Sequence, residues 1–205
     1  FSEDVAIDGP AGQYRFLAAF EKSAAAAGEV TEFYVADPAE MPPIVGEVVL
    51  WGEDAALAKW LADRGIRVAQ PSPGKREVIL ACAAPPAPGG AAAFRDLASR
   101  IARGSTAIFL CPEALKKGDQ AAGWLPLKNK GTFGGISRWL YLTDDWAKAH
   151  PIFDGLPAGG LMDYTVYREL IPDQVWSGQD APAEAVAGGI NAAQGYQSGL
   201  LVAVH

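Results

Sequence analysis

The sequence predicts an α/β fold, a three-layer sandwich in which helices cover both faces of a mostly parallel sheet. Short apolar strands alternate with helices of about three turns between Glu47 and Leu110, and such alternation is typical of right-handed crossovers between parallel strands. The strands at residues 48–51, 78–81 and 106–110 hold hardly any polar side chain, as expected for strands covered on both faces. We therefore expect these three strands to be central and nearly fully buried.

The chain divides into a lead-in, residues 1–45, and one α/β domain, residues 46–205. A helix is predicted over residues 14–27, with Gly28 as its stop, and residues 30–35 alternate in polarity as a strand does. The apolar face of this helix consists of Phe16, Leu17 and Phe20. The last apolar run halts at His205 without a closing turn, so we expect the domain to be truncated at its C-terminus.

Two helices in the α/β domain follow from spacing with a period of 3.6 residues. Their apolar faces are Leu57, Trp60 and Leu61 in the first, and Phe94, Leu97, Ala98 and Ile101 in the second. Glu53 and Asp54 suit the N-terminus of the first helix, while Gly65 and Gly104 would end the two helices. A short strand at residues 66–69 lies between them.

The regular pattern loosens after Cys111. Residues 116–139 are rich in Lys, Gly and turn formers, which predicts a long excursion over the sheet. Two apolar runs at residues 184–188 and 199–204 are then expected to be closing strands.

Composition narrows the classes of function. The net charge of −7 over 205 residues argues against a nucleic-acid partner, because binding to phosphates needs a basic surface. The chain has neither a basic amphipathic stretch nor an unbroken apolar run that spans a bilayer, so no membrane partner is expected. The chain begins at Phe1 without a leader. Removal of a signal peptide would explain this start and favours a periplasmic or extracellular location, and excision from a larger protein is the alternative.

Three segments resemble a known family. They are residues 78–90, the elbow segment 104–113, and the segment His-Pro-Ile-Phe-Asp-Gly-Leu-Pro at residues 150–157. Together they resemble the class I glutamine amidotransferase-like, flavodoxin-like domains found as accessory modules in glycoside hydrolases, including the trimerisation-type domain of β-galactosidases. The resemblance covers residues 47–205 and implies that fold, together with a place in carbohydrate metabolism in bacteria.

Cys111 stands where the amidotransferases carry their nucleophile. In that family glycines flank the cysteine two residues before and two after, whereas this chain has Phe109 and Glu113, and Pro112 offers no N–H as an oxyanion donor. We therefore predict that Cys111 is not catalytic. The alternative is a catalytic pair of Cys111 with His150, one of two histidines. Cys82 and Cys111 each end a strand-like run, and neighbouring parallel strands would bring them close; buried free thiols are the expected state, and a disulfide is the alternative.

Other candidate sites have both a structural and a functional interpretation. His150 is expected to cap a turn rather than bind metal, since no cysteine or histidine cluster accompanies it, and no cofactor is expected. The candidate ligand site is an aromatic surface that would bind sugar, and the alternative is that the same residues lie in the core: Tyr164, Tyr167, Arg168 and Trp176. A further aromatic set is predicted to form an exposed interaction patch: Trp124, Trp139, Tyr141, Trp146 and Trp176.

The sequence thus favours a non-catalytic domain, an architectural or oligomerisation module of a larger carbohydrate-processing protein. Its expected partners are other domains of the parent chain or further copies of itself, with carbohydrate as a possible ligand. The alternatives are a stand-alone amidotransferase-like hydrolase that uses Cys111, and a carbohydrate-binding module. Fold alone does not choose among them, because one fold hosts unrelated activities.

Overall fold

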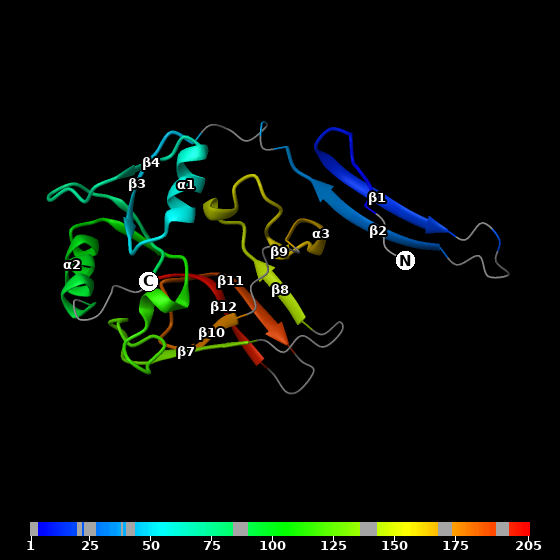
Figure 1. The fold of residues 1–205 in the computed structure, drawn as a ribbon. Coiled ribbons are helices and arrows are strands. Elements are labelled where there is room, and N and C mark those ends of the chain that lie inside the picture. The colour runs from blue at the N-terminus through cyan, green and yellow to red at the C-terminus, as the bar shows by residue number, and fades with distance from the viewer. Residues whose placement is uncertain are drawn as a thin grey trace.

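The computed structural model describes residues 4–19, 22, 28–37, 39, 44–83, 90–135, 143–167, 174–191 and 197–205. Within these residues twelve strands form three separate sheets, and two α-helices are longer than a single turn (Figure 1). The largest sheet is antiparallel throughout. The predicted flavodoxin-like three-layer sandwich is therefore wrong. The parallel pattern stops after four strands, and the later strands pair with one another instead of extending it.

The parallel sheet has the strand order β4-β3-β5-β6. Its strands are β3 (Glu47–Trp51), β4 (Arg67–Ala69), β5 (Val78–Ala81) and β6 (Thr106–Phe109). Helix α1 (Ala55–Asp63) connects β3 to β4, and α2 (Gly90–Ala102) connects β5 to β6. The two crossovers run in opposite directions along the sheet, so right-handed connections place the helices on opposite faces. The predicted strands and helices of this region are confirmed, but Trp60, expected on the apolar face of α1, is 48% exposed.

The face of the parallel sheet beneath α2 holds the main core. Phe94 and Leu97 of α2 pack there with Trp51, Ile79 and Ala81. Arg100, rather than the predicted Ala98 and Ile101, is the third buried position of α2. In α1 the carboxylate of Asp54 accepts from the N–H of Leu57 and caps the N-terminus, as the acidic residues there predicted.

The opposite face of the parallel sheet is only partly covered. Val78, Ile108 and Leu110 are 41%, 39% and 50% exposed, so the predicted near-complete burial of these strands is wrong. Two features explain the exposure. Strand β6 is an edge strand rather than a central one, and α1 packs over β4 at the other edge.

The antiparallel sheet has the order β7-β10-β12-β11-β8-β9. Its strands are β7 (Lys130–Gly135), β8 (Thr143–Ala147), β9 (Gly160–Leu161), β10 (Gln174–Gln179), β11 (Glu184–Asn191) and β12 (Gln197–Val204). The two closing strands predicted from the sequence are confirmed as β11 and β12. The predicted excursion of residues 116–139 is partly wrong, because β7 lies within it and its Phe133 packs against the α2-side core.

A glycine in β11 shows how closely this antiparallel sheet is packed. A Cβ atom at Gly188 would lie 2.7 Å from the ring of Trp146 and 2.8 Å from the carbonyl oxygen of Gly199. Real Cβ contacts are longer, so a side chain here would displace the tryptophan or the neighbouring strand. Gly188 therefore allows the half-buried Trp146 to lie flat on the sheet.

A β-hairpin precedes the parallel sheet. It consists of β1 (Gly12–Ala19) and β2 (Gly28–Val35), which pair in register from Gly12 with Val35 to Ala19 with Gly28. The strand predicted at residues 30–35 is confirmed, whereas the helix predicted over residues 14–27 is wrong for its described part. Cross-strand pairing with the β-branched and aromatic residues of β2 outweighs a local helical pattern in β1. The predicted boundary near residue 45 falls between β2 and β3.

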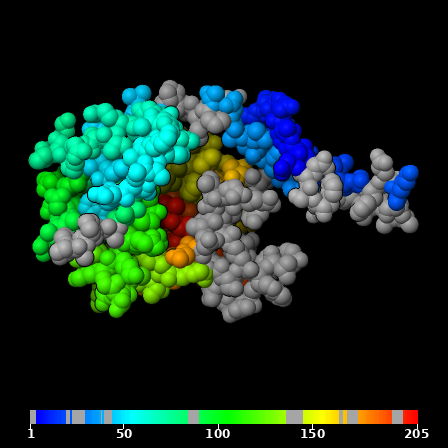
Figure 2. Space-filling view, in the orientation of Figure 1, coloured from blue at the N-terminus to red at the C-terminus, as the bar shows by residue number. Residues whose placement is uncertain are grey.

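The hairpin projects from the rest of the molecule, as the space-filling view shows (Figure 2). Its nearest described neighbour is α3 (Tyr164–Tyr167), a single turn that contacts β2. None of the described helices combines the length and the apolar character that a membrane span requires.

Candidate functional site

Cys111 and Cys82 meet at the carboxyl edge of the parallel sheet, where open α/β sheets usually carry their ligands. The thiol of Cys111 donates to the carbonyl oxygen of Cys82 at 3.1 Å. The thiol of Cys82 in turn lies 3.6 Å from the carbonyl oxygen of Trp51. Both cysteines are free. The predicted proximity of the two free thiols is confirmed, and thiol–carbonyl contacts link the ends of three strands.

Burial raises the pKa of both thiols. For Cys111, desolvation has the largest effect, and it exceeds the opposing effect of the backbone N–H of Ala114. The carboxylate of Glu113 raises the pKa further. For Cys82, desolvation again dominates, followed by the carboxylate of Asp54. Since the thiolate is the reactive form of cysteine, both residues remain protonated and weakly nucleophilic at neutral pH.

The bulky flanks of Cys111 have structural roles. Phe109 stacks on Phe94 of α2, with ring centroids 6.4 Å apart. Pro112 begins the 3₁₀ helix η2 (Pro112–Leu115), for which Cys111 is the N-terminal flanking residue. Ala114 and Leu115 of this helix are buried in the α2-side core. The segment that would form a nucleophile elbow therefore connects β6 to η2, and η2 packs into the core.

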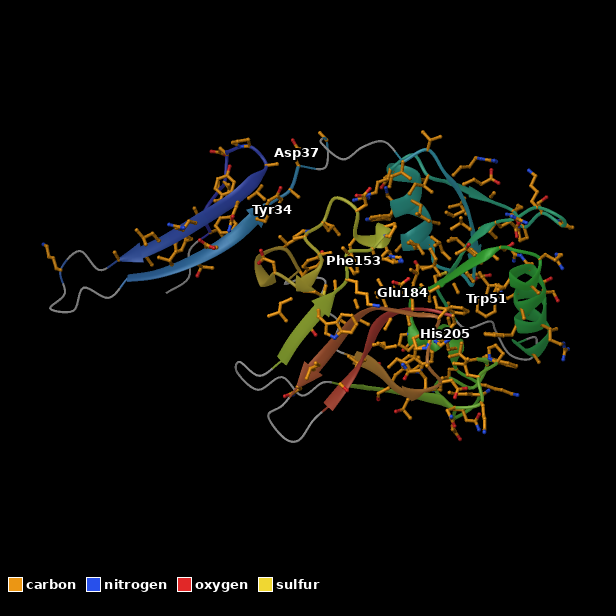
Figure 3. The ribbon with its side chains drawn as sticks, turned by 180° about the vertical axis from the view of Figure 1, so that it is seen from behind. Tyr34, Asp37, Trp51, Phe153, Glu184 and His205 are labelled. Carbon is orange, nitrogen blue, oxygen red and sulfur yellow. The ribbon has the colours of Figure 1, made fainter. Side chains whose placement is uncertain are left out.

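His150 lies in a different environment from Cys111. Its Nδ1 accepts a hydrogen bond from the N–H of Ile152 at 3.2 Å, and this contact caps the 3₁₀ helix η3 (Pro151–Phe153). Its Nε2 lies 3.7 Å from a carboxylate oxygen of Glu184 on β11, which Figure 3 labels. Both ring nitrogens thus face groups other than Cys111, and the predicted role of His150 as a turn cap is confirmed.

The candidate sugar residues have partners inside the protein. Tyr167 is 1% exposed, its hydroxyl donates to the carbonyl oxygen of Pro157 at 2.7 Å, and burial raises its pKa. The indole N–H of Trp176 donates to the carbonyl oxygen of Lys130 at 2.8 Å. Arg168 and the side chain of Tyr164 lie outside the described residues. The two described side chains, those of Tyr167 and Trp176, therefore pack inside the protein, and they do so in different parts of the molecule.

The predicted aromatic patch is not present in the described residues. Trp124, Trp146 and Trp176 are each half-buried. Trp124 stacks on Phe94 with centroids 5.3 Å apart, and Trp176 stacks on Phe133 at 6.0 Å. Trp124 therefore packs against the α2-side core, and Trp176 packs against Phe133 of the neighbouring strand β7. Trp139 and Tyr141 lie outside the described residues.

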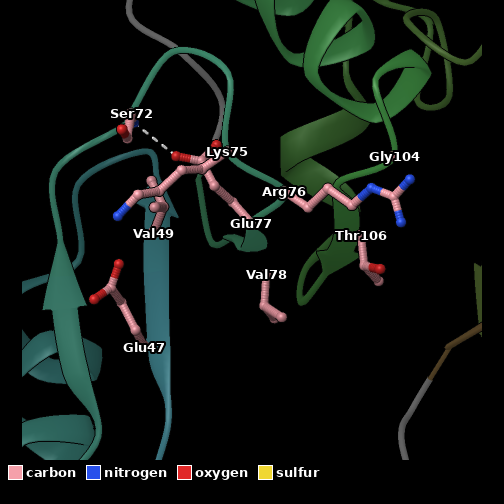
Figure 4. Close-up of a pocket in the computed structure, with 9 residues that line it drawn as sticks. All are labelled: Glu47, Val49, Ser72, Lys75, Arg76, Glu77, Val78, Gly104 and Thr106. Atoms are coloured by element: carbon pink, nitrogen blue, oxygen red, sulfur yellow. Dashed lines mark hydrogen bonds between the residues drawn. The ribbon is translucent and has the colours of Figure 1, made fainter.

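A pocket of about 260 Å³ lies at the opposite edge, where β5 begins (Figure 4). Its lining includes Lys75, Arg76 and Thr106, together with Glu77. Glu77 accepts from both Nε and a terminal nitrogen of Arg100, at 2.8 and 2.6 Å, and from the N–H of Ser72 at 2.7 Å. The N–H of Ser72 contributes most to lowering the pKa of Glu77, and Arg100 lowers it further against the effect of burial.

Sequence reasoning missed this Glu77–Arg100 pair, although a signal was present. Arg100 stands three residues after Leu97 and six after Phe94, so it continues the buried stripe of α2. A charged residue on such a stripe needs a buried partner, and Glu77 directly precedes an apolar strand. The pair ties the last turn of α2 to the start of β5, which is a structural role.

No group of three or more metal-ligating side chains occurs in the part of the chain that the structure describes. Residues 84–89, part of the segment 78–90 that carries the family resemblance, lie outside the described residues. Comparison with family models, curated proteins and solved structures finds no match. The resemblance to accessory domains of glycoside hydrolases therefore stays a prediction.

Proposed function

We propose that this chain is a non-catalytic domain that joins protein surfaces, as an architectural or oligomerisation module. The observation that carries the proposal is the state of Cys111. Its thiol donates to the carbonyl oxygen of Cys82, and burial raises its pKa. A cysteine nucleophile needs the opposite environment, a base or a positive group that favours the thiolate.

The surface of the hairpin supports the interaction role. Leu17, Val30 and Tyr34 are 66%, 49% and 50% exposed on two paired strands. An isolated two-stranded hairpin is marginally stable in water, and exposed apolar groups gathered on one element are typical of protein contacts. This element is better suited to binding another protein than to chemistry.

The larger protein in which the domain would work is proposed from the family resemblance alone. The segments at residues 78–90, 104–113 and 150–157 carry that resemblance together, and it points to a carbohydrate-processing parent. In that setting the domain would contact a catalytic or sandwich domain, or another copy of itself.

Turnover assays test the proposal. The purified chain should hydrolyse neither glutamine nor an aryl glycoside above the rate of a buffer blank. Cys111→Ser and the matched Cys82→Ser should behave as the wild type does. Hydrolysis that Cys111→Ser removes and Cys82→Ser retains would establish the hydrolase alternative instead.

A further inference from the structure

One face of the hairpin is bare along its described length. The register places four cross-strand pairs on this outer face, and the last of them is Ala19 with Gly28. Six larger residues form the other three pairs: Gln13 with Tyr34, Arg15 with Glu32, and Leu17 with Val30. All six are exposed, and Figure 3 labels Tyr34 on β2. A continuous strip of polar and apolar side chains therefore faces solvent on an element that projects from the body.

The other face of the hairpin is covered by its own chain at one end. Tyr14 and Phe33 stack there with ring centroids 5.7 Å apart. The hydroxyl of Tyr14 donates to the carbonyl oxygen of Pro10 at 2.7 Å, and a Cβ at Gly9 would collide with the same ring. The N-terminal segment thus packs on the Tyr14 end of the inner face, whereas Phe16 and Thr31 of that face remain exposed. The outer face differs in that none of its three larger pairs is even partly buried.

The charges of the outer face fit a second copy of the same face. Arg15 and Glu32 form its central pair, with N–O distances of 3.1 and 3.2 Å. A two-fold axis parallel to the strands exchanges β1 and β2, so each residue meets the equivalent of its own cross-strand partner. Arg15 then lies over Glu32 of the other copy, Leu17 over Val30 and Gln13 over Tyr34. Such an interface is isologous and closed.

The other two-fold arrangement is unfavourable. An axis across the strands would place Arg15 over Arg15 and Glu32 over Glu32 of the second copy. Like charges in direct contact repel at short range, and Leu17 would meet Gln13 rather than an apolar residue. The pairing pattern of β1 and β2 therefore selects one orientation.

We infer that the outer face of the hairpin binds the outer face of a second copy of this chain, about a two-fold axis parallel to the strands. The inference rests on the proposed interaction role and names its partner. The two hairpins would stack as aligned two-stranded sheets. Six residues a side is well below the roughly 20–30 of a standard interface, so the dimer should be weak, with a dissociation constant in the micromolar range or above.

Sedimentation equilibrium of the complete chain, from about 10 μM to about 1 mM so as to cover weak complexes, provides the first test. The wild type should shift from monomer to dimer over this range. Val30→Lys, on the outer face, should weaken the dimer by at least about tenfold, because it presents an unpaired charge to the interface. Thr31→Lys is the matched control, an exposed neighbour on the inner face, and should dimerise as the wild type does. A wild-type chain that stays monomeric, or equal effects of the two lysines, would overturn the inference.

A charge exchange tests the axis itself. The double variant Arg15→Glu with Glu32→Arg should dimerise with itself as the wild type does, since the opposite charges still meet. Mixed with a size-tagged wild type, it should form no heterodimer, because like charges would then face one another. Preferential heterodimers would contradict the axis proposed here. None of these outcomes bears on turnover, so failure of the dimer and failure of the non-catalytic function can be told apart.

Discussion

Two arginine–glutamate pairs with similar contacts lie in opposite surroundings. Arg100 and Glu77 approach to 2.6 Å with side chains 7% and 8% exposed, and they join α2 to β5. Arg15 and Glu32 approach to 3.1 Å with side chains 70% and 43% exposed, and they lie on the hairpin. The first pair is enclosed by the fold it stabilises, whereas the second faces outward. The comparison shows that an arginine–glutamate pair stabilises the fold where it is buried. On the hairpin the same type of pair remains exposed to solvent.

Arg100→Ala should have the largest effect on stability. The substitution leaves the Glu77 carboxylate buried without its main charged partner, and breaking a buried pair costs about 3–5 kcal/mol. Chemical denaturation should show this loss in the free energy of unfolding. Lys59→Ala, which removes an exposed partner of Asp63, is the control, and its effect should stay below about 1 kcal/mol. Equal effects of both variants would remove the distinction between buried and exposed pairs.

The buried pair should also make stability depend on pH. The folded-state pKa of Glu77 is lowered from the ordinary value of 4.5. Its stabilising contribution is therefore fully present above that value and is lost as the pH falls through the folded-state pKa. Denaturation between about pH 6 and pH 3 should show a steeper loss of stability for the wild type than for Glu77→Gln. Parallel curves for the two proteins would contradict this role of Glu77.

Arg15→Ala should have the smallest effect on folding. The Arg15–Glu32 pair is exposed, and such pairs contribute about 0–1 kcal/mol. The free energy of unfolding, measured at a concentration where the chain is monomeric, should therefore change by less than about 1 kcal/mol. Self-association measured at higher concentration should weaken clearly. A large loss of monomer stability would mean that the exposed pair, like the buried one, supports the fold.

The parallel sheet was predictable because its signals are local. Strands β3, β5 and β6 are built on apolar runs. The helices between the strands have their own signals, such as the cap Asp54 at the start of α1. The hairpin shows the limit of the same reasoning. Phe16 and Leu17 fit a helical face as well as a strand, and the deciding interaction is pairing with β2, which no local pattern contains.

The antiparallel sheet was largely beyond sequence reasoning. Strands β11 and β12 were recognisable, but the order β7-β10-β12-β11-β8-β9 depends on contacts between strands far apart in the chain. The candidate site was predictable in part. The strand-end positions of Cys82 and Cys111 predicted their proximity, whereas the carbonyl partners of the thiols and the Glu77–Arg100 pair depend on three-dimensional packing.

The pH dependence of Cys111 alkylation tests the central claim, a non-catalytic domain, most directly. Iodoacetamide modification can be followed by mass spectrometry of the Cys111 peptide in wild type, Cys82→Ser and His150→Ala. The raised pKa predicts that the rate reaches half its maximum above the ordinary thiol value of 9.0, and that neither variant accelerates or slows it at neutral pH. Rapid modification at neutral pH that His150→Ala abolishes would contradict the account, because it would require an activated thiolate paired with that histidine.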